Sequence, residues 1–308
     1  MIPAHNMKDF KELMKGKKIT QINFGQSGAE VYDIDGEIIL KHVCREKLKE
    51  NQFETYKKEA LFYQSQLNAT GQTSSEHAYT NTYLPQIFKI ELSPDEIILL
   101  MKKYPLLERK DINDALIKKI AAVLAQIHAT PIPVFLNDTN DQPAPMSTEE
   151  IQSCLDGWKS VLAEHPATFD ETPLVETASK INEIIEWHAA EPHILTQGDF
   201  HFENLLRDQD GSLIVCDWQG VKSAGASEDI SFFLSRLGDD GLKIDATVFL
   251  NEYARAISEL TGQTPDTQNI LRHMKAANTI TTFKFWHAFL HGSSAERVKG
   301  IYDNMKTN

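Results

Sequence analysis

The feature that most constrains the fold of this chain is a change in hydrophobic periodicity after its first third. Up to residue 101, apolar residues alternate with polar ones or form short runs, a pattern that is typical of β-strands. The predicted strands cover residues 19–23, 30–34, 37–41, 86–92 and 96–101. One long amphipathic helix is expected over 46–67, a short helix over 7–16 and a loop over 69–82. Asp35-Gly36 and Ser93-Pro94-Asp95 are turn sequences between consecutive strands, so this part predicts an antiparallel sheet.

From Leu106 onward the periodicity is helical. The predicted helices end at His128 or lie within 148–190, 227–237, 245–260 and 266–291. A single hairpin, 204–207 with 212–216, interrupts them. We therefore expect an α+β, bilobal fold, in which residues 1–101 form an N-terminal sheet lobe and residues 102–308 form a larger, mostly helical lobe. A cleft between two such lobes is the expected ligand site.

Three polar residues have a spacing that suits phosphoryl transfer. Asp199, Asn204 and Asp217 form the pattern Asp-x₄-Asn-x₁₂-Asp. This reaction requires an aligned nucleophile and cations that neutralise the phosphates. A carboxylate can orient a hydroxyl and accept its proton, and carboxylate and amide oxygens bind Mg²⁺. Taken singly, these residues could cap turns or begin a helix, but their spacing, the hairpin and the apolar flanks together favour a catalytic site.

The same region resembles the aminoglycoside phosphotransferase and choline kinase-like family. The resemblance rests on Leu195-Thr196-Gln197-Gly198-Asp199-Phe200-His201-Phe202-Glu203-Asn204-Leu205-Leu206, on Val215-Cys216-Asp217-Trp218-Gln219, on Gly225-Ala226-Ser227-Glu228-Asp229-Ile230 and on Ala125-Gln126-Ile127-His128. It implies a protein-kinase-like fold and phosphorylation of a small molecule by ATP or GTP. It also implies that Asp199 is the catalytic base and that Asn204 and Asp217 bind Mg²⁺.

Three further roles follow from the resemblance alone. Asp229 would anchor the catalytic loop, and His201 matches a histidine that is frequent just after the catalytic aspartate. Gln197 is a departure, because the family usually has a supporting histidine at that position. Glutamine can also donate and accept hydrogen bonds, so the substitution concerns the geometry of the loop and removes no catalytic atom.

The nucleotide half of the site is predicted from a glycine loop and a strand lysine. Gly25, Ser27 and Gly28 lie between two strands, where backbone N–H groups can approach phosphates, although an ordinary hairpin turn has the same composition. Lys41 follows at the end of an apolar strand, where protein kinases keep the lysine that pairs with the α- and β-phosphates. An exposed lysine at a strand end is the alternative.

A helix glutamate and the connector between the lobes complete this half. Glu59 lies beside the apolar stripe of the predicted helix and is expected to hold the strand lysine, with Glu54 as the competing candidate. Met101 and Lys103 belong to the connector, whose backbone would bind the adenine edge. Any peptide can serve there, so the residue types themselves contribute little to this prediction.

The acceptor should lie over Asp199, between helices of the C-terminal lobe. Glu228 and Asp240 are candidates for holding a cationic acceptor, and Trp286 could stack on it. Each could equally be a residue of the helix surface or the packed core. The histidines of the predicted helix 266–291 provide no convincing set of four zinc ligands.

The sequence is compatible with three classes of function. The favoured one is a kinase that phosphorylates a hydroxyl of a cationic small molecule such as an aminoglycoside or another basic antibiotic, with a choline-like amino alcohol or a sugar as the alternative acceptor. A role in antibiotic resistance and one in metabolism both stay open. A protein kinase is disfavoured, because the stretch 218–227 is too short for an activation loop and no Ala-Pro-Glu segment follows. A catalytically impaired nucleotide-binding regulator has only Gln197 in its support.

Composition limits the partners. The first 104 residues carry 14 basic and 14 acidic residues, so the whole net charge of −13 belongs to the remainder. This charge disfavours nucleic acid and favours cationic ligands, although acidic surfaces also simply maintain solubility. No apolar run suits a membrane span and no signal peptide is recognised, while the three distant cysteines suit a reducing cytoplasm. We expect a cytoplasmic monomer or weak dimer that binds neither nucleic acid nor membranes.

Overall fold

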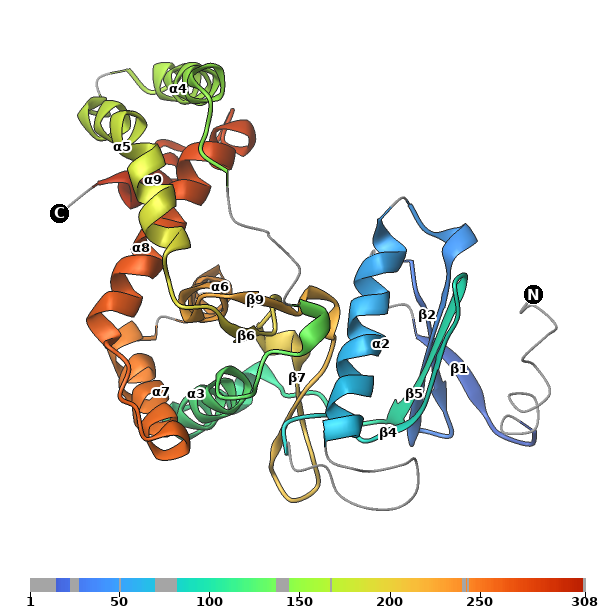
Figure 1. The fold of residues 1–308 in the computed structure, drawn as a ribbon. Helices are drawn as coiled ribbons and strands as arrows, with labels where there is room; N and C mark the ends of the chain where they lie inside the picture. Colours follow the sequence, from blue (N-terminus) through green and yellow to red (C-terminus); the bar gives the residue numbers. More distant parts are fainter. Residues whose placement is uncertain are drawn as a thin grey trace.

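The N-terminal lobe is a five-stranded antiparallel sheet with the strand order β1-β2-β3-β5-β4 (Figure 1). The computed structural model describes residues 15–22, 28–49, 51–69, 82–136, 144–166, 168–239, 242 and 244–306. The strands are β1 (Ile19–Ile22), β2 (Glu30–Ile34), β3 (Ile38–Cys44), β4 (Ile87–Leu92) and β5 (Glu96–Lys102). The predicted sheet is confirmed, while the helix predicted over 7–16 and the loop predicted over 69–82 lie almost entirely outside the described residues.

Strand β3 is longer than the sequence predicted. It continues to Cys44, so Lys41 lies inside the strand and the expectation that it ends the strand is wrong. The continuation depends on His42, which is buried and whose ring nitrogens bond to Glu30 at 3.1 Å and to Glu96 at 2.7 Å. Because both glutamates lie on neighbouring strands, this polar residue can be buried in the sheet without losing its hydrogen bonds.

Helix α2 (Gln52–Ala69) is the main helix among the described residues of this lobe, and it packs on one face of the sheet (Figure 1). It begins later than the predicted residue 46, after a short 3₁₀ turn, η1 (Arg45–Lys47). Asn51 has a φ of +72°, a left-handed conformation that cannot continue a helix. The backbone of Asn51 therefore separates the charged segment at 45–47 from the helix proper.

The C-terminal lobe is mostly helical. Its helices are α3 (Asp114–His128), α4 (Thr148–Ala163), α5 (Thr172–Ala189), α6 (Ala226–Asp239), α7 (Ala246–Thr261), α8 (Thr267–Phe285) and α9 (Ala295–Tyr302). Short 3₁₀ turns are η2 (Arg109–Asp111), η3 (Val134–Leu136), η4 (Phe202–Asn204), η5 (Trp218–Gly220), η6 (Trp286–Phe289) and η7 (Asp303–Met305). Its strands form two antiparallel pairs, β6 (Ile194–Thr196) with β9 (Lys222–Ala224), and β7 (Leu205–Arg207) with β8 (Leu213–Val215).

The bilobal α+β fold is thus confirmed, with local differences. The predicted hairpin is present as β7 and β8, but the sequence missed the β6–β9 pair. β7 and β8 are joined by a turn sequence, whereas β6 and β9 are equally short but far apart in the sequence, so only tertiary pairing defines them. The sequence also missed α9, and the helix predicted up to residue 291 ends at Phe285.

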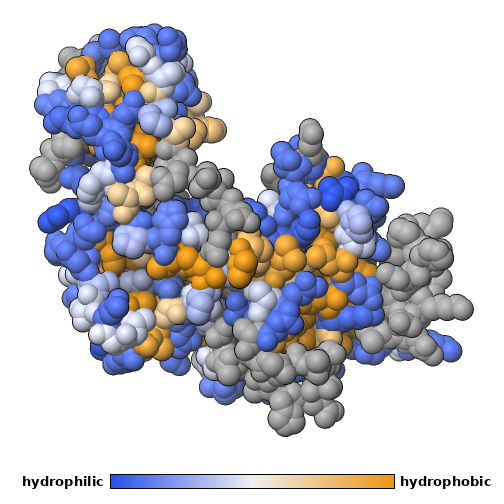
Figure 2. All heavy atoms as spheres, viewed as in Figure 1, coloured by the Kyte–Doolittle hydropathy of each residue, from blue (hydrophilic) through white to orange (hydrophobic). Residues whose placement is uncertain are grey.

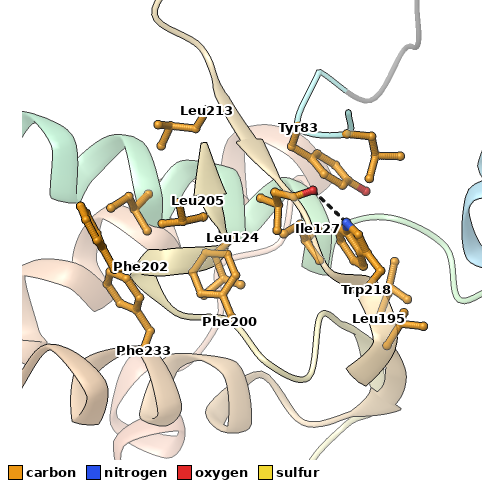
Figure 3. Close-up of a cluster of buried hydrophobic side chains, with 14 of the residues drawn as sticks. Tyr83, Leu124, Ile127, Leu195, Phe200, Phe202, Leu205, Leu213, Trp218 and Phe233 are labelled. Carbon is orange, nitrogen blue, oxygen red and sulfur yellow. Dashed lines mark hydrogen bonds between the residues drawn. The ribbon is translucent and has the colours of Figure 1, made fainter. Parts of the chain in front are cut away.

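One continuous core joins the two lobes. Figure 3 shows Phe200 of the catalytic loop packed beside Phe233 of α6, with a distance of 5.5 Å between the ring centroids. Trp218 is fully buried and donates from Nε1 to the carbonyl of Val215 at 2.9 Å (Figure 3). Its indole also stacks on Phe62 of α2 at 4.2 Å, so α2 of the N-terminal lobe contacts η5 of the C-terminal lobe directly.

The surface is polar over most of the visible face, with a band of apolar side chains across its middle (Figure 2). This band runs between the helical lobe and the region of α2, below a hollow that separates α4, α5 and α9 from the N-terminal lobe (Figures 1 and 2). Among the described residues, no helix combines the length and the apolar character that crossing a membrane would require.

Candidate active site

Lys41 lies at the centre of a buried ion-pair network. Its Nζ is 2.7 Å from Oε2 of Glu59 on α2 and 3.0 Å from Oδ1 of Asp217 after β8. Glu59 is almost fully buried, whereas the expected competitor Glu54 is exposed and pairs with Arg45. Burial alone would lower the pKa of Lys41, but the two carboxylates outweigh it and raise that pKa above its ordinary value. Burial raises the pKa of Glu59, against the opposing effect of Lys41.

Asp217 occupies a strained position between β8 and η5. Its φ is +57°, in the left-handed region that non-glycine residues seldom adopt. Lys41 and Gln219 both donate to its Oδ1, so Oδ2 accepts no hydrogen bond from the described part of the chain. Burial would raise the pKa of Asp217, but the Lys41 ammonium and the two hydrogen bonds hold it below the ordinary value. The lowered pKa favours the ionised carboxylate, and its Oδ2 is left without a partner among the described residues.

Asp199 and Asn204 lie together on the loop between β6 and β7. Asn204 donates from Nδ2 to the backbone carbonyl of Asp199 at 2.9 Å and to its Oδ2 at 3.2 Å. Nε2 of His201 is 3.4 Å from the same Oδ2, and Nδ1 of His201 bonds to Glu203 at 2.7 Å. The carboxylate of Asp199 remains 45 % exposed, so a substrate hydroxyl can reach it. Burial would lower the pKa of His201, but Asp199 and Glu203 raise it.

Gln197 connects the loop that carries Asp199 to the segment that carries Asp217. It is fully buried, and its Oε1 accepts from the backbone N–H of Asp199 at 2.7 Å. Its Nε2 donates to the carbonyls of Cys216 at 3.2 Å and Asp217 at 2.7 Å. Both ends of the amide are thus used, and the side chain fixes the backbone of Asp199 relative to that of Asp217.

Asp229, near the start of α6, holds the loop from the other side. Its carboxylate accepts from the backbone N–H groups of Gln197 at 2.8 Å and Gly198 at 2.9 Å. His128, at the end of α3, lies 3.2 Å from the same carboxylate and bonds through Nδ1 to Tyr253 at 2.8 Å. The sequence marked His128 only as a family match, and no local pattern identified Tyr253, because α7 brings it to this site from far along the chain.

Gly198 allows the loop to pass close to η5. Its φ is +80°, and a Cβ added there would lie 1.9 Å from the carbonyl oxygen of Gly220. The two backbones are in direct contact, so no side chain fits between them.

The remaining predicted nucleotide residues have mixed positions. Gly25 and Ser27 lie outside the described residues; Gly28 has a φ of +80° and lies close to Leu48. Met101 is buried in β5. Lys103 donates from its backbone N–H to the carbonyl of Glu37 at 2.7 Å, and its ammonium pairs with Asp33 at 2.6 Å. The backbone N–H of Lys103 is thus already paired within the sheet lobe.

A cavity of about 690 Å³ adjoins the catalytic loop. Gly198, next to Asp199, forms part of its wall, together with residues of α5, β9, α6 and α8. The predicted acceptor residues Glu228 and Trp286 both line it, while Asp240 lies outside the described residues. Glu228 forms an ion pair with Lys222 of β9, a partner that the sequence did not identify.

Taken together, a sheet lobe with a lysine–glutamate pair and a helical lobe with an Asp-x₄-Asn loop define a protein-kinase-like fold. The chain belongs to the ecdysteroid kinase-like family, whose model matches residues 21–264. The resemblance to kinase-like phosphotransferases that was inferred from the sequence is thereby confirmed. A comparison with curated proteins found no match.

Solved structures share the fold at low sequence identity. An aminoglycoside phosphotransferase with ADP bound is 14 % identical, with a TM-score of 0.53 over 99 % of this chain and 97 % of that one. The ethanolamine kinase of Plasmodium vivax is 14 % identical, with a TM-score of 0.56 over 96 % of this chain and 84 % of that one. An aminoglycoside phosphotransferase in complex with gentamicin is 12 % identical, with a TM-score of 0.54 over 100 % and 98 % of the two chains.

Proposed function

We propose that this protein transfers the γ-phosphate of ATP or GTP to a hydroxyl group of a small molecule. The observation that supports this most is the convergence of Lys41, Glu59 and Asp217 from three separate elements, beside a loop that presents Asp199 and Asn204. These residues serve nucleotide binding, metal binding and proton acceptance in the kinase mechanism. An impaired regulator would not require an exposed carboxylate on this loop.

The donor set suits Mg²⁺. Asp217 offers its Oδ2, and Asn204 offers its amide oxygen because its nitrogen already donates to Asp199. Both are hard oxygen ligands of the type that Mg²⁺ prefers. When bound, the ion would neutralise charge on the phosphates of the nucleotide. The N–H of Cys216 donates to the carbonyl of Asn204 at 3.0 Å, which holds the two ligand segments in register.

The chain's own residues would perform the other steps of the reaction. Lys41, held by Glu59, would contact the phosphates as a fixed cation. Asp199 would orient the acceptor hydroxyl and accept its proton. Gln197 and Asp229 would keep the loop in place through their hydrogen bonds to its backbone. Water exclusion would come from the buried aromatic residues below the loop.

Two classes of acceptor are considered. The acidic C-terminal lobe favours a cationic acceptor such as an aminoglycoside or an amino alcohol. The lining of the cavity favours a neutral one, because its carboxylates have internal partners. Glu228 pairs with Lys222, Glu191 binds Ser227, and Asp229 binds two backbone N–H groups of the catalytic loop. A neutral hydroxyl-bearing compound, including the steroid class that the family's name mentions, would pack on Trp286 and the apolar lining.

The test is nucleotide consumption with a panel of acceptors. The protein, Mg²⁺ and ATP or GTP are incubated with aminoglycosides, amino alcohols, sugars and hydroxylated steroids, and the phosphorylated product is identified by mass spectrometry. We expect Asp199→Asn to lower kcat by roughly 10²–10⁴-fold while nucleotide binding persists. Asp210→Asn, in the turn between β7 and β8, serves as the control and should behave as wild type. Retained nucleotide binding without transfer to any acceptor would favour the regulator, and equal turnover of Asp199→Asn and wild type would exclude the mechanism.

A further inference from the structure

Three metal-ligating side chains meet where α5 ends against α8, away from the catalytic residues. His188 lies in the last turn of α5, Glu191 follows that helix, and His273 lies in α8 (Figure 1). One nitrogen of each imidazole and one carboxylate oxygen of Glu191 all lie within 4.8 Å of one another. Of the histidines that the sequence analysis considered in the predicted helix 266–291, His273 belongs to this cluster. His291 does not, because it pairs with Glu164 at 2.7 Å.

The two imidazoles lack hydrogen bonds that burial normally demands. His273 is only 4 % exposed, and its Nδ1 has no partner among the described residues. Nδ1 of His188 is likewise buried without a partner in the described part of the chain. Leaving a buried polar atom unpaired costs roughly 1–3 kcal/mol, so two such atoms in one cluster require an explanation. Trp187 stacks on His273 at 3.9 Å with an angle of 9° between the rings, which fixes the orientation of that imidazole.

Glu191 is held in place by a second residue, as metal-binding carboxylates commonly are. Its two oxygens accept from the backbone N–H and the hydroxyl of Ser227. A carboxylate has about four acceptor positions, so two remain for a cation. Burial lowers the pKa of both His188 and His273, which keeps the imidazoles in the neutral form that binds metals.

Neutral core histidines are the simpler interpretation, but that interpretation leaves the Nδ1 atoms of both imidazoles without a partner among the described residues. We propose that His188, Glu191 and His273 form a binding site for a divalent transition-metal ion of the Zn²⁺ type. Two imidazoles and one carboxylate suit Zn²⁺, and tetrahedral coordination with bonds of about 2.0–2.2 Å places ligand atoms about 3.4 Å apart. A pair of ligand atoms at the 4.8 Å limit would therefore have to approach by roughly 1.4 Å. The site is chemically distinct from the all-oxygen Mg²⁺ ligands at Asp217 and Asn204.

The position of the cluster connects it to the acceptor cavity. His188 and Glu191 line that cavity. With three protein ligands, a zinc ion keeps a coordination position for water or another oxygen ligand. The ion would join α5 to α8 and place a positive charge in the wall of the cavity.

The experiment uses the full-length, tag-free protein with excess Mg²⁺, so that the catalytic residues do not take up the added metal. Co²⁺ is titrated as a spectroscopic substitute for Zn²⁺, and its visible absorption reports nitrogen and oxygen coordination. The variants are His273→Phe, which retains the stacking on Trp187, and Glu191→Gln, which retains contacts with Ser227. His193→Gln is the matched control, because His193 lines the same cavity but lies outside the cluster.

We expect wild type to bind a single Co²⁺ per chain that Zn²⁺ displaces. Each cluster variant should weaken binding by at least about tenfold, while His193→Gln matches wild type. Circular dichroism checks that each variant is folded. If His273→Phe does not fold, the metal affinity of Glu191→Gln tests the proposal. Absence of Co²⁺ and Zn²⁺ binding by wild type, unchanged affinity in the folded cluster variants, or an intense sulfur-to-cobalt band would each overturn the proposal.

Discussion

The two halves of the site differ in how their polar groups are held. In the loop that carries Asp199, the side chains of Gln197 and Asp229 bond to backbone atoms, so the position of the loop depends on these two residues. In the acceptor cavity, Glu228 pairs with the side chain of Lys222, and Glu191 accepts from both the backbone N–H and the hydroxyl of Ser227. A loop that is held through its backbone keeps its position when other side chains along it change. A contact between two side chains is lost when either residue is replaced. If the proposed function holds, substitutions in the acceptor cavity should change the choice of acceptor without changing the reaction type.

Asp217→Asn is the substitution from which we expect the largest loss of function in the catalytic half. The substitution removes the negative charge that faces Lys41 and the metal position. We expect the apparent affinity for Mg²⁺ to fall by at least about tenfold and kcat by roughly 10²–10³-fold, because one electrostatic partner of the transition state is lost. Activity is measured against Mg²⁺ concentration, with Asp210→Asn as the control. A normal Mg²⁺ dependence of the variant would contradict the assignment.

Gly198→Ala tests whether backbone contact keeps the loop in place. The new Cβ would meet the carbonyl of Gly220 at 1.9 Å, and the φ of +80° adds strain. We expect a loss of at least about 2 kcal/mol in the free energy of unfolding, together with most of the activity. Gly211→Ala is the matched control, because Gly211 has a φ of +83° with open space around it. That control should cost about 1 kcal/mol, and equal losses for the two variants would show that strain alone matters.

Variants of Gln197 test whether this residue acts by positioning Asp199. Gln197→Ala leaves the N–H of Asp199 and the carbonyl of Asp217 without their partner. We expect kcat to fall by about tenfold to a hundredfold through misplacement of Asp199, with the KM for nucleotide unchanged. Gln197→His, which restores the residue usual in related kinases, should recover most of the rate because histidine also donates and accepts. Equal defects in the alanine and histidine variants would count against the positioning role.

Trp286→Ala probes the acceptor half. Because Trp286 lines the cavity, its loss should raise the KM for the acceptor by about tenfold and leave nucleotide binding unchanged. Phe285→Ala is the control, since Phe285 is exposed and does not line the cavity. A change in nucleotide affinity in the Trp286 variant would show that the two halves are coupled.

The smallest expected effect concerns pH. The folded-state pKa of His201 is raised above its ordinary value of 6.5, because Asp199 and Glu203 favour its charged form. The resulting stability is fully present below pH 6.5 and is lost as the pH rises through the raised pKa. The unfolding free energy of wild type should therefore exceed that of His201→Gln by less than about 1 kcal/mol at low pH, and this difference should shrink at pH 9. A difference that grows with pH would reverse the assigned sign.

Local patterns predicted much of this molecule. Periodicity and turn residues identified the strands of the N-terminal sheet, the hairpin of β7 and β8 and helix α3. All of these are short-range features. Asp199, Asn204 and Asp217 were found for the same reason, since they lie on one loop and the hairpin that follows it. Their roles in catalysis and metal binding stay predictions until the variants are measured.

Other features depend on parts of the chain that are distant in sequence. Lys41 was expected at a strand end, but the pairing of β3 with β5 extends the strand beyond it. β6 and β9 pair where Gly220 of η5 lies against Gly198, so this pair depends on the tertiary contact between two distant segments.

By itself, the sequence determined the order of the N-terminal strands and of the main helices, and the spacing of Asp199, Asn204 and Asp217, because periodicity and loop length act over a few residues. The tertiary structure decided between Glu59 and Glu54 as the partner of Lys41, and it alone decided that Glu228 has Lys222 as its partner and that His188 meets His273. Those pairs depend on how helices pack, and packing depends on the volumes and burial of many side chains at once.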